Sequence, residues 1–91
     1  MDKRLSRRLG PSAKNLYLGS PAELRCSTLV TLAPSIDRQT FQDDLARHHG
    51  SVRSWMPEAN IASVDIEIGA LMDLAALDGV VYVEAGQAYK P

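Results

Sequence analysis

Carboxylates at alternate positions of one strand-like segment are the residues whose spacing suggests chemistry. The segment from Ile61 to Ile68 alternates between apolar and polar residues with a period of two, which is typical of a half-buried strand. The apolar set faces a core, while Asp65 and Glu67 face water or a partner. Carboxylates on a sheet surface suit the N-termini of partner helices, whose free N–H groups and dipole favour negative charge. A solvated polar face explains the same alternation without a partner.

The other reactive residue types do not form a catalytic group. His48 and His49 are adjacent, so on a helix they point about 100° apart, and they read as helix-end residues rather than metal ligands. Cys26 is the single cysteine and has no base beside it in the sequence. Gly69 and Gly79 are isolated, which excludes a glycine-rich phosphate-binding loop. We therefore predict a protein that is not an enzyme and that uses no metal or cofactor.

Two further residues have alternative interpretations. Trp55 and Met56, just before Pro57, could form an exposed contact patch or close the open end of a small core. In the strand to which they belong, the alternation sets Val52, Ser54 and Met56 against Arg53 and Trp55.

The elements that would position the acids follow one another as strand, helix, strand, strand, helix, strand. The predicted strands cover Ser27–Leu32, Ser51–Met56, Ile61–Ile68 and Val80–Glu84. The predicted helices run from about Asp37 to His48, with Ser35 or Asp37 as the cap, and from Ala70 to Leu77.

This order predicts an α+β fold of the ferredoxin-like βαββαβ type. Right-handed crossovers give an antiparallel sheet of order 4-1-3-2 with both helices on one face. The open face would then carry Asp65, Glu67, Tyr82 and Glu84.

Length and charge suit one small domain with a basic leader. The chain has 91 residues. Residues 1–25 contain six Lys or Arg and two Asp or Glu, whereas residues 26–91 contain four Lys or Arg and nine Asp or Glu. We predict a flexible basic arm over residues 1–25 and a folded domain over 26–91.

The same features bear on partners and compartment. Acids on the open face would repel phosphates, which argues against specific nucleic-acid binding, although the arm could touch nucleic acid without specificity. No apolar run reaches the length of a signal peptide core or a membrane span. As written, the chain is expected in the cytoplasm, and no membrane partner is expected. If the chain is cut from a longer precursor, it is expected outside the cytoplasm.

The run from Leu74 through Glu84 resembles the propeptide of subtilisin-like serine proteases and its free-standing inhibitor relatives. The resemblance covers roughly Ser27 to Tyr89, and the family hallmark of a leucine helix, a turn and Val-x-Tyr-Val-Glu is matched by Val80, Tyr82, Val83 and Glu84. Gly86 stands where the family has a second acid, so Asp65 or Glu67 would have to substitute.

The resemblance implies a domain that inhibits, or assists the folding of, a subtilisin-like protease. The open sheet face would pack on two parallel helices of the enzyme, with Glu84 as a helix-capping acid. The C-terminal segment Gln87-Ala88-Tyr89-Lys90-Pro91 would lie in the active-site cleft like a product. Tyr89 is the first choice for the specificity pocket and Lys90 the second.

An interaction or dimerisation domain without a protease partner is the alternative. Sheet faces of this fold pair into dimers, and Trp55, Met56 and Tyr82 could be the anchors of a homodimer.

Overall fold

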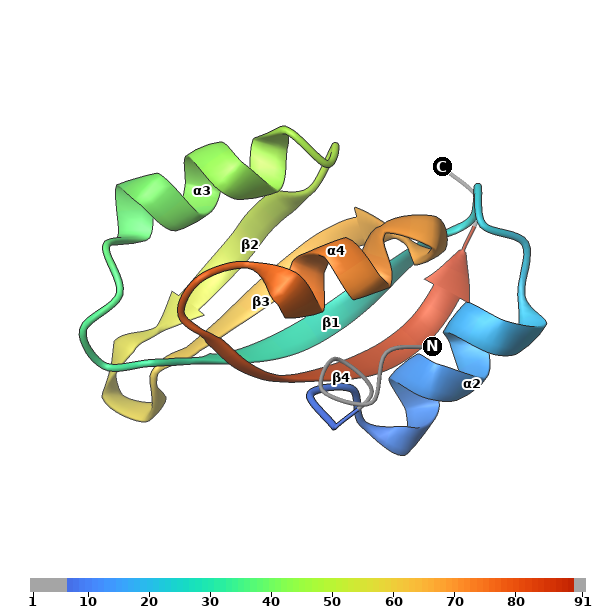
Figure 1. Ribbon diagram of the computed structural model, residues 1–91, viewed down its shortest axis with the longest axis horizontal. Helices are drawn as coiled ribbons and strands as arrows, with labels where there is room; N and C mark the ends of the chain where they lie inside the picture. The colour runs from blue at the N-terminus through green and yellow to red at the C-terminus, as the bar shows by residue number, and fades with distance from the viewer. Residues whose placement is uncertain (1–6, 90–91) are drawn as a thin grey trace.

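The computed structural model describes residues 7–89 and shows an α+β fold built on one four-stranded sheet (Figure 1). The sheet order is β2-β3-β1-β4, and all neighbouring strands are antiparallel, as predicted. The elements are α2 (Pro11–Gly19), β1 (Arg25–Leu32), α3 (Arg38–Ala46), β2 (Ser51–Met56), η1 (Pro57–Ala59), β3 (Ile61–Glu67), η2 (Ile68–Ala70), α4 (Leu71–Ala76) and β4 (Val80–Tyr89).

Helix α3 shows how local signals position the elements. The Asp37 carboxylate accepts hydrogen bonds from the Gln39 backbone N–H at 3.3 Å and from the Thr40 hydroxyl at 2.6 Å. Asp37 is therefore the N-cap, one of the two predicted caps. The helix ends at Ala46, two residues before the predicted end at His48.

Strand β2 contains a bulge that changes which of its side chains face the core. The register with β3 shifts between Val52 and Ser54, so Arg53 is the extra residue. Val52 and Trp55 both lie opposite buried residues of β3 and pack against the core. The predicted alternation across β2 is therefore wrong, because a strict period of two does not allow for an inserted residue. Ser54 and Met56 lie on the other face.

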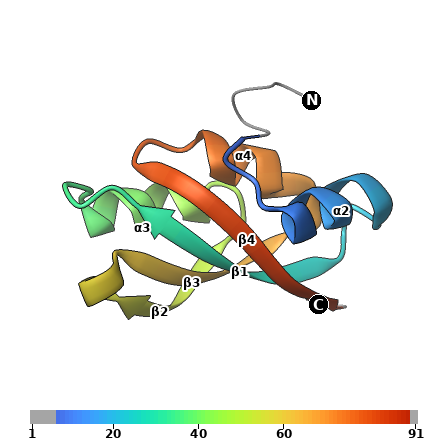
Figure 2. The same cartoon turned by 90° about the horizontal axis from the view of Figure 1, so that it is seen from below.

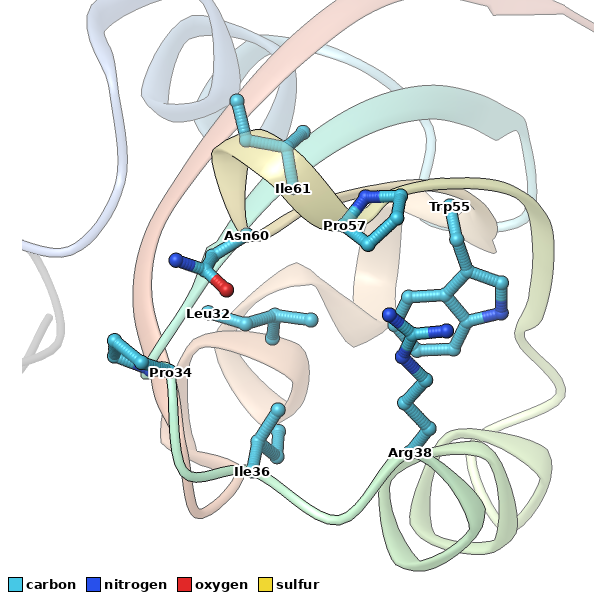
Figure 3. Close-up of a pocket in the computed structure, with 8 residues that line it drawn as sticks. All are labelled: Leu32, Pro34, Ile36, Arg38, Trp55, Pro57, Asn60 and Ile61. Carbon is cyan, nitrogen blue, oxygen red and sulfur yellow. The ribbon is translucent and has the colours of Figure 1, made fainter.

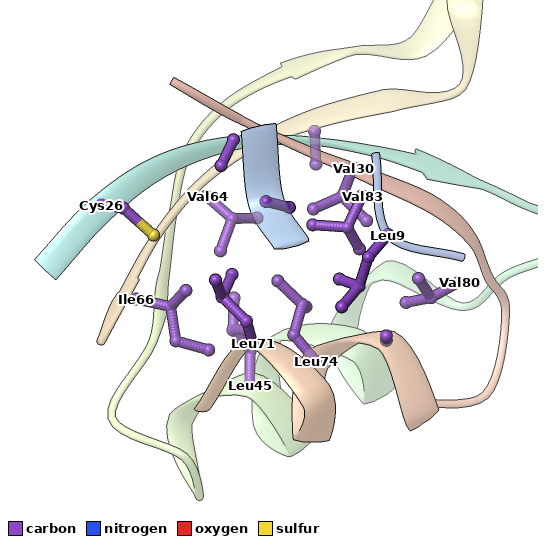
Figure 4. Close-up of a cluster of buried hydrophobic side chains, with 14 of the residues drawn as sticks. Leu9, Cys26, Val30, Leu45, Val64, Ile66, Leu71, Leu74, Val80 and Val83 are labelled. Carbon is purple, nitrogen blue, oxygen red and sulfur yellow. The ribbon is translucent and has the colours of Figure 1, made fainter. Parts of the chain in front are cut away.

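The hydrophobic core lies between the sheet and the helices (Figure 4). Each strand contributes the residues of its inner face, and α3 and α4 contribute their apolar sides. The largest fully buried side chains are Phe41, Leu9, Leu45, Ile66, Ile68, Leu71 and Leu74.

The N-terminal region packs on the sheet where the sequence indicated a flexible arm over residues 1–25. Helix α2 begins at Pro11, a residue that suits the first helical position, and lies beside β4 on the same side of the sheet as α3 and α4 (Figure 2). Leu9 is 2% exposed and Ala13 is fully buried. Leu16 and Tyr17 also pack against the core, so positions 9, 13, 16 and 17 have the spacing of one helix face. The prediction of an arm followed the basic and polar composition of the segment and missed this spacing. Residues 1–6 of the predicted arm lie outside the described residues.

A short backbone bridge joins this region to β4. The Gly10 N–H donates to the Val83 carbonyl at 2.7 Å, and the Val83 N–H donates to the Arg8 carbonyl at 2.6 Å. The Arg8 guanidinium also donates to the Ala75 carbonyl of α4 at 2.9 Å. Residues 8–10 therefore run parallel to β4 along its outer edge.

Candidate functional site

The candidate site is the face of the sheet opposite the helices, here called the open face. α2, α3 and α4 lie on the other side of the sheet, and no described element covers the open face (Figure 2). The strand register places one row of side chains across all four strands, in the order Tyr82, Thr31, Ile61 and Met56. Leu29 lies in the neighbouring row, between Glu84 and Ser63.

Large apolar side chains are exposed on this face. Leu29, in the inner strand β1, is 50% exposed, Met56 is 40% exposed and Tyr82 is 37% exposed. Tyr89 is also 37% exposed and lies opposite Arg25 at the other end of the face. Apolar groups that cluster on one face mark a protein contact surface more often than isolated ones do.

Asp65 lies on the open face as predicted, but its charge is used within the chain. The Arg25 side-chain Nε donates to the Asp65 carboxylate at 2.6 Å, and Asp65 as a whole is only 7% exposed. Arg25 also donates to the backbone carbonyls of His49 at 2.9 Å and Asp65 at 3.3 Å. The pair closes one end of the face, so Asp65 does not offer a free carboxylate. Glu67 is half-buried and forms no ion pair with any other described residue.

Glu84 is directed at its own chain. Its Oε1 accepts a hydrogen bond from the Ala85 N–H at 3.0 Å. Its carboxylate lies against Gly10, where an added Cβ would be 2.7 Å from Oε1 and would overlap the carboxylate. Gly10 is also the N-cap of α2. Glu84 was predicted from the resemblance to cap a helix of a partner, and here it lies at the start of a helix of the same chain, where the helix dipole favours its charge.

Three of the five residues predicted to form a cleft-filling tail, Gln87, Ala88 and Tyr89, belong to β4. Ala88 lies opposite Cys26 and packs against the core, and Tyr89 lies opposite Arg25. Gln87 is exposed. The strand is longer than the predicted segment ending at Glu84 because β1 also begins earlier, and its first residues pair with the end of β4. Lys90 and Pro91 lie outside the described residues.

A shallow cavity of about 150 Å³ lies on the open face around Gly86. Its lining residues come from β1, β3 and β4 and include Ser27, Leu29, Ser63 and Glu84. A Cβ added to Gly86 would lie 3.5 Å from the Ser27 carbonyl oxygen, an ordinary contact distance. The absence of a side chain therefore leaves a recess beside Leu29.

The other reactive residues do not assemble into a site. Cys26 is fully buried, and burial, followed by the nearby Asp65 charge, raises the pKa of its thiol to about 11. The thiol is therefore protonated near neutral pH and is a poor nucleophile. His48 Nδ1 lies 3.8 Å from the Asp73 carboxylate. Within residues 7–89 no three His, Cys, Asp or Glu side chains come close enough to hold a metal ion.

Trp55 and Met56 divide between the two interpretations given above. The Trp55 ring packs edge-on against the Phe41 ring, at 6.0 Å between centroids and an angle of 67°, and helps to close the core. Met56 is exposed on the open face. Of these two residues, Met56 alone is therefore available as a contact residue on the open face.

No family model, curated protein or solved structure matches this chain. Among the described helices, none has the length and apolar character needed to cross a membrane.

Proposed function

We propose that this chain is a binding module for a subtilisin-like serine protease, acting as an inhibitor or folding assistant through the open face of its sheet. The observation that carries the proposal is the uncovered face with Leu29, Met56 and Tyr82 exposed on it. Burying such side chains against a partner stabilises a complex by roughly 25 cal/mol per Å² of apolar area removed from water.

The choice of a protease as the partner rests on the resemblance. The matched residues Val80, Tyr82, Val83 and Glu84 fall in β4, and the strand order agrees with the ferredoxin-like arrangement that this family has. On this proposal Tyr82 and Leu29 pack against the enzyme's helices. Glu84 would reach an enzyme helix only by leaving its position against Gly10.

The pairing of β4 changes how a product-like segment could work. Gln87, Ala88 and Tyr89 would have to separate from β1 before they could enter a cleft. Separation of Ala88 would also uncover Cys26 and part of the core. We therefore propose that the sheet face supplies most of the binding and that any cleft-filling residues follow Tyr89.

The proposal is tested by mixing the chain with a purified bacterial subtilisin and measuring hydrolysis of a chromogenic peptide. We expect concentration-dependent inhibition that Leu29→Glu weakens, because a carboxylate would be buried without a partner. Leu18→Glu is the matched control, since Leu18 is 73% exposed and belongs to α2, on the helix side of the sheet. Equal inhibition by both variants, or no inhibition well above micromolar concentrations, contradicts the proposal.

A homodimer that uses the same face is the second candidate, and the exposed Met56 and Tyr82 side chains favour it. Light scattering distinguishes the two. A dimer that Leu29→Glu dissociates, together with no effect on the protease, supports self-association. A monomer that inhibits the protease supports the first proposal.

A further inference from the structure

A second cavity lies at one end of the sheet, where the β1–α3 turn meets the β2–β3 hairpin (Figure 3). It has a volume of about 60 Å³. Leu32, which is 4% exposed, Ile36 and Ile61 give it apolar walls. Arg38, Trp55 and Asn60 are its polar and aromatic members.

The arginine of this cavity is held in place by an aromatic ring. The central guanidinium carbon of Arg38 lies 5.1 Å from the centroid of the Trp55 ring, which is cation–π geometry. The Trp55 ring is itself fixed against Phe41, which is 1% exposed. A guanidinium that rests on a ring keeps its in-plane N–H donors free for an acceptor.

These donors have no acceptor within residues 7–89. The ion pairs there involve Arg25, Arg47 and His48, and the Arg38 side chain takes part in none of the hydrogen bonds. The neighbouring Asp37 carboxylate is already used as the cap of α3. The positive charge of Arg38, an exposed residue stacked on Trp55, therefore lines a cavity whose lining contains no carboxylate.

Asn60 also lines the same cavity. Its backbone has the left-handed conformation, with φ of 54° and ψ of 42°. The Asn60 N–H donates to the Pro57 carbonyl at 3.2 Å, and its carbonyl accepts from the Leu32 N–H at 2.8 Å. The residue is thus fixed by its backbone, and its side-chain amide lies beside Leu32, across the cavity from Arg38 and directed away from it (Figure 3).

We propose that this cavity binds a carboxylate carried on a short aliphatic group. The Arg38 fork would hold the two carboxylate oxygens, and the aliphatic group would lie on Leu32 and Ile36. The cavity is small, at about 60 Å³, so the aliphatic group that enters it must be short. A free short-chain acid and the C-terminal residue of a peptide share this chemistry.

The test uses the full-length chain labelled with ¹⁵N. Trp55 is the only tryptophan, so its indole N–H gives a single resolved NMR signal at the cavity. The probes are isobutyrate and N-acetyl-alanine, each compared with its uncharged amide at equal ionic strength. We expect saturable shifts with the acids, with dissociation constants on the order of 1 mM, and none with the amides. Tighter binding of N-acetyl-alanine than of isobutyrate indicates a peptide C-terminus, and the reverse indicates a free acid.

Two substitutions locate the effect. Arg38→Gln should weaken acid binding by about tenfold or more, since it removes a charged hydrogen-bond donor. Arg38→Lys keeps the charge but loses the fork, and should give an intermediate loss. Arg47→Gln is the control, because Arg47 follows the same helix and its side chain is 77% exposed. Equal shifts with acids and amides, no saturable shift, or unchanged binding in both Arg38 variants overturns the proposal.

Discussion

Leu9→Ala is expected to destabilise the protein strongly, although Leu9 precedes helix α2 and lies in a basic segment. Leu9 is 2% exposed, joins the hydrophobic core, and is bracketed by the hydrogen bonds of Arg8 and Gly10 to Val83. Leu→Ala changes at buried positions cost about 2–5 kcal/mol. Leu9 lies at the margin of the core, where a short segment can partly collapse into the space, so we expect about 2–3 kcal/mol. That corresponds to a fall in Tm of about 8–24 °C for a domain of this size.

The assay is urea and thermal unfolding followed by circular dichroism. Leu18→Ala is the matched control, because Leu18 is 73% exposed on α2, and it should change stability by less than about 0.5 kcal/mol. An unchanged denaturant slope in both variants confirms that stability alone has changed. If Leu9→Ala costs no more than Leu18→Ala, the segment before α2 is not part of the cooperative unit and the reasoning is wrong.

Three other predictions concern contacts of the site. Gly10→Ala should lower the free energy of unfolding by about 1–3 kcal/mol, because the added Cβ meets the Glu84 carboxylate. Adding Glu84→Ala to the same chain should recover most of that loss, and no recovery would exclude this contact as the cause. Cys26 should resist iodoacetamide at pH 8 in the folded protein and react once urea unfolds it, as mass spectrometry would show; rapid labelling of the native form contradicts the burial and the raised pKa of the thiol. Arg25→Met should lower the free energy of unfolding by about 2–4 kcal/mol, because it leaves the largely buried Asp65 carboxylate unpaired. Adding Asp65→Leu should restore stability, and a double-mutant cycle measures this coupling directly.

The sheet order was predictable because the sequence signals agreed with one another. Period-two segments, two short helical stretches and a turn between Met56 and Ile61 allow few topologies once crossovers must be right-handed. The Asp37 cap was also visible, because its partners are two and three residues away. Features that depend on neighbouring residues were therefore open to prediction.

The contacts that define the site depend on residues far apart in the sequence. Arg25 and Asp65 are separated by 40 positions, and the pattern placed Asp65 on the right face without revealing its partner. The position of Glu84 against Gly10 followed from the N-terminal segment, which composition indicated to be an arm. The alternation grouped Val52 with Met56, whereas the two lie on opposite faces of β2, because the bulge at Arg53 leaves no mark in a simple alternation.

The bridge between Val83 and residues 8–10 also bears on how the sheet meets other sheets. An unpaired edge strand offers its N–H and C=O groups to strands of other molecules, which is a route to aggregation. In the part of the chain that the structure describes, the middle of the β4 edge is occupied by the bridge, and the opposite edge, β2, is interrupted by a bulge at Arg53, an exposed cation. Both edges are therefore hindered from pairing with strands of other molecules. Association through the open face then has less competition from edge-to-edge pairing.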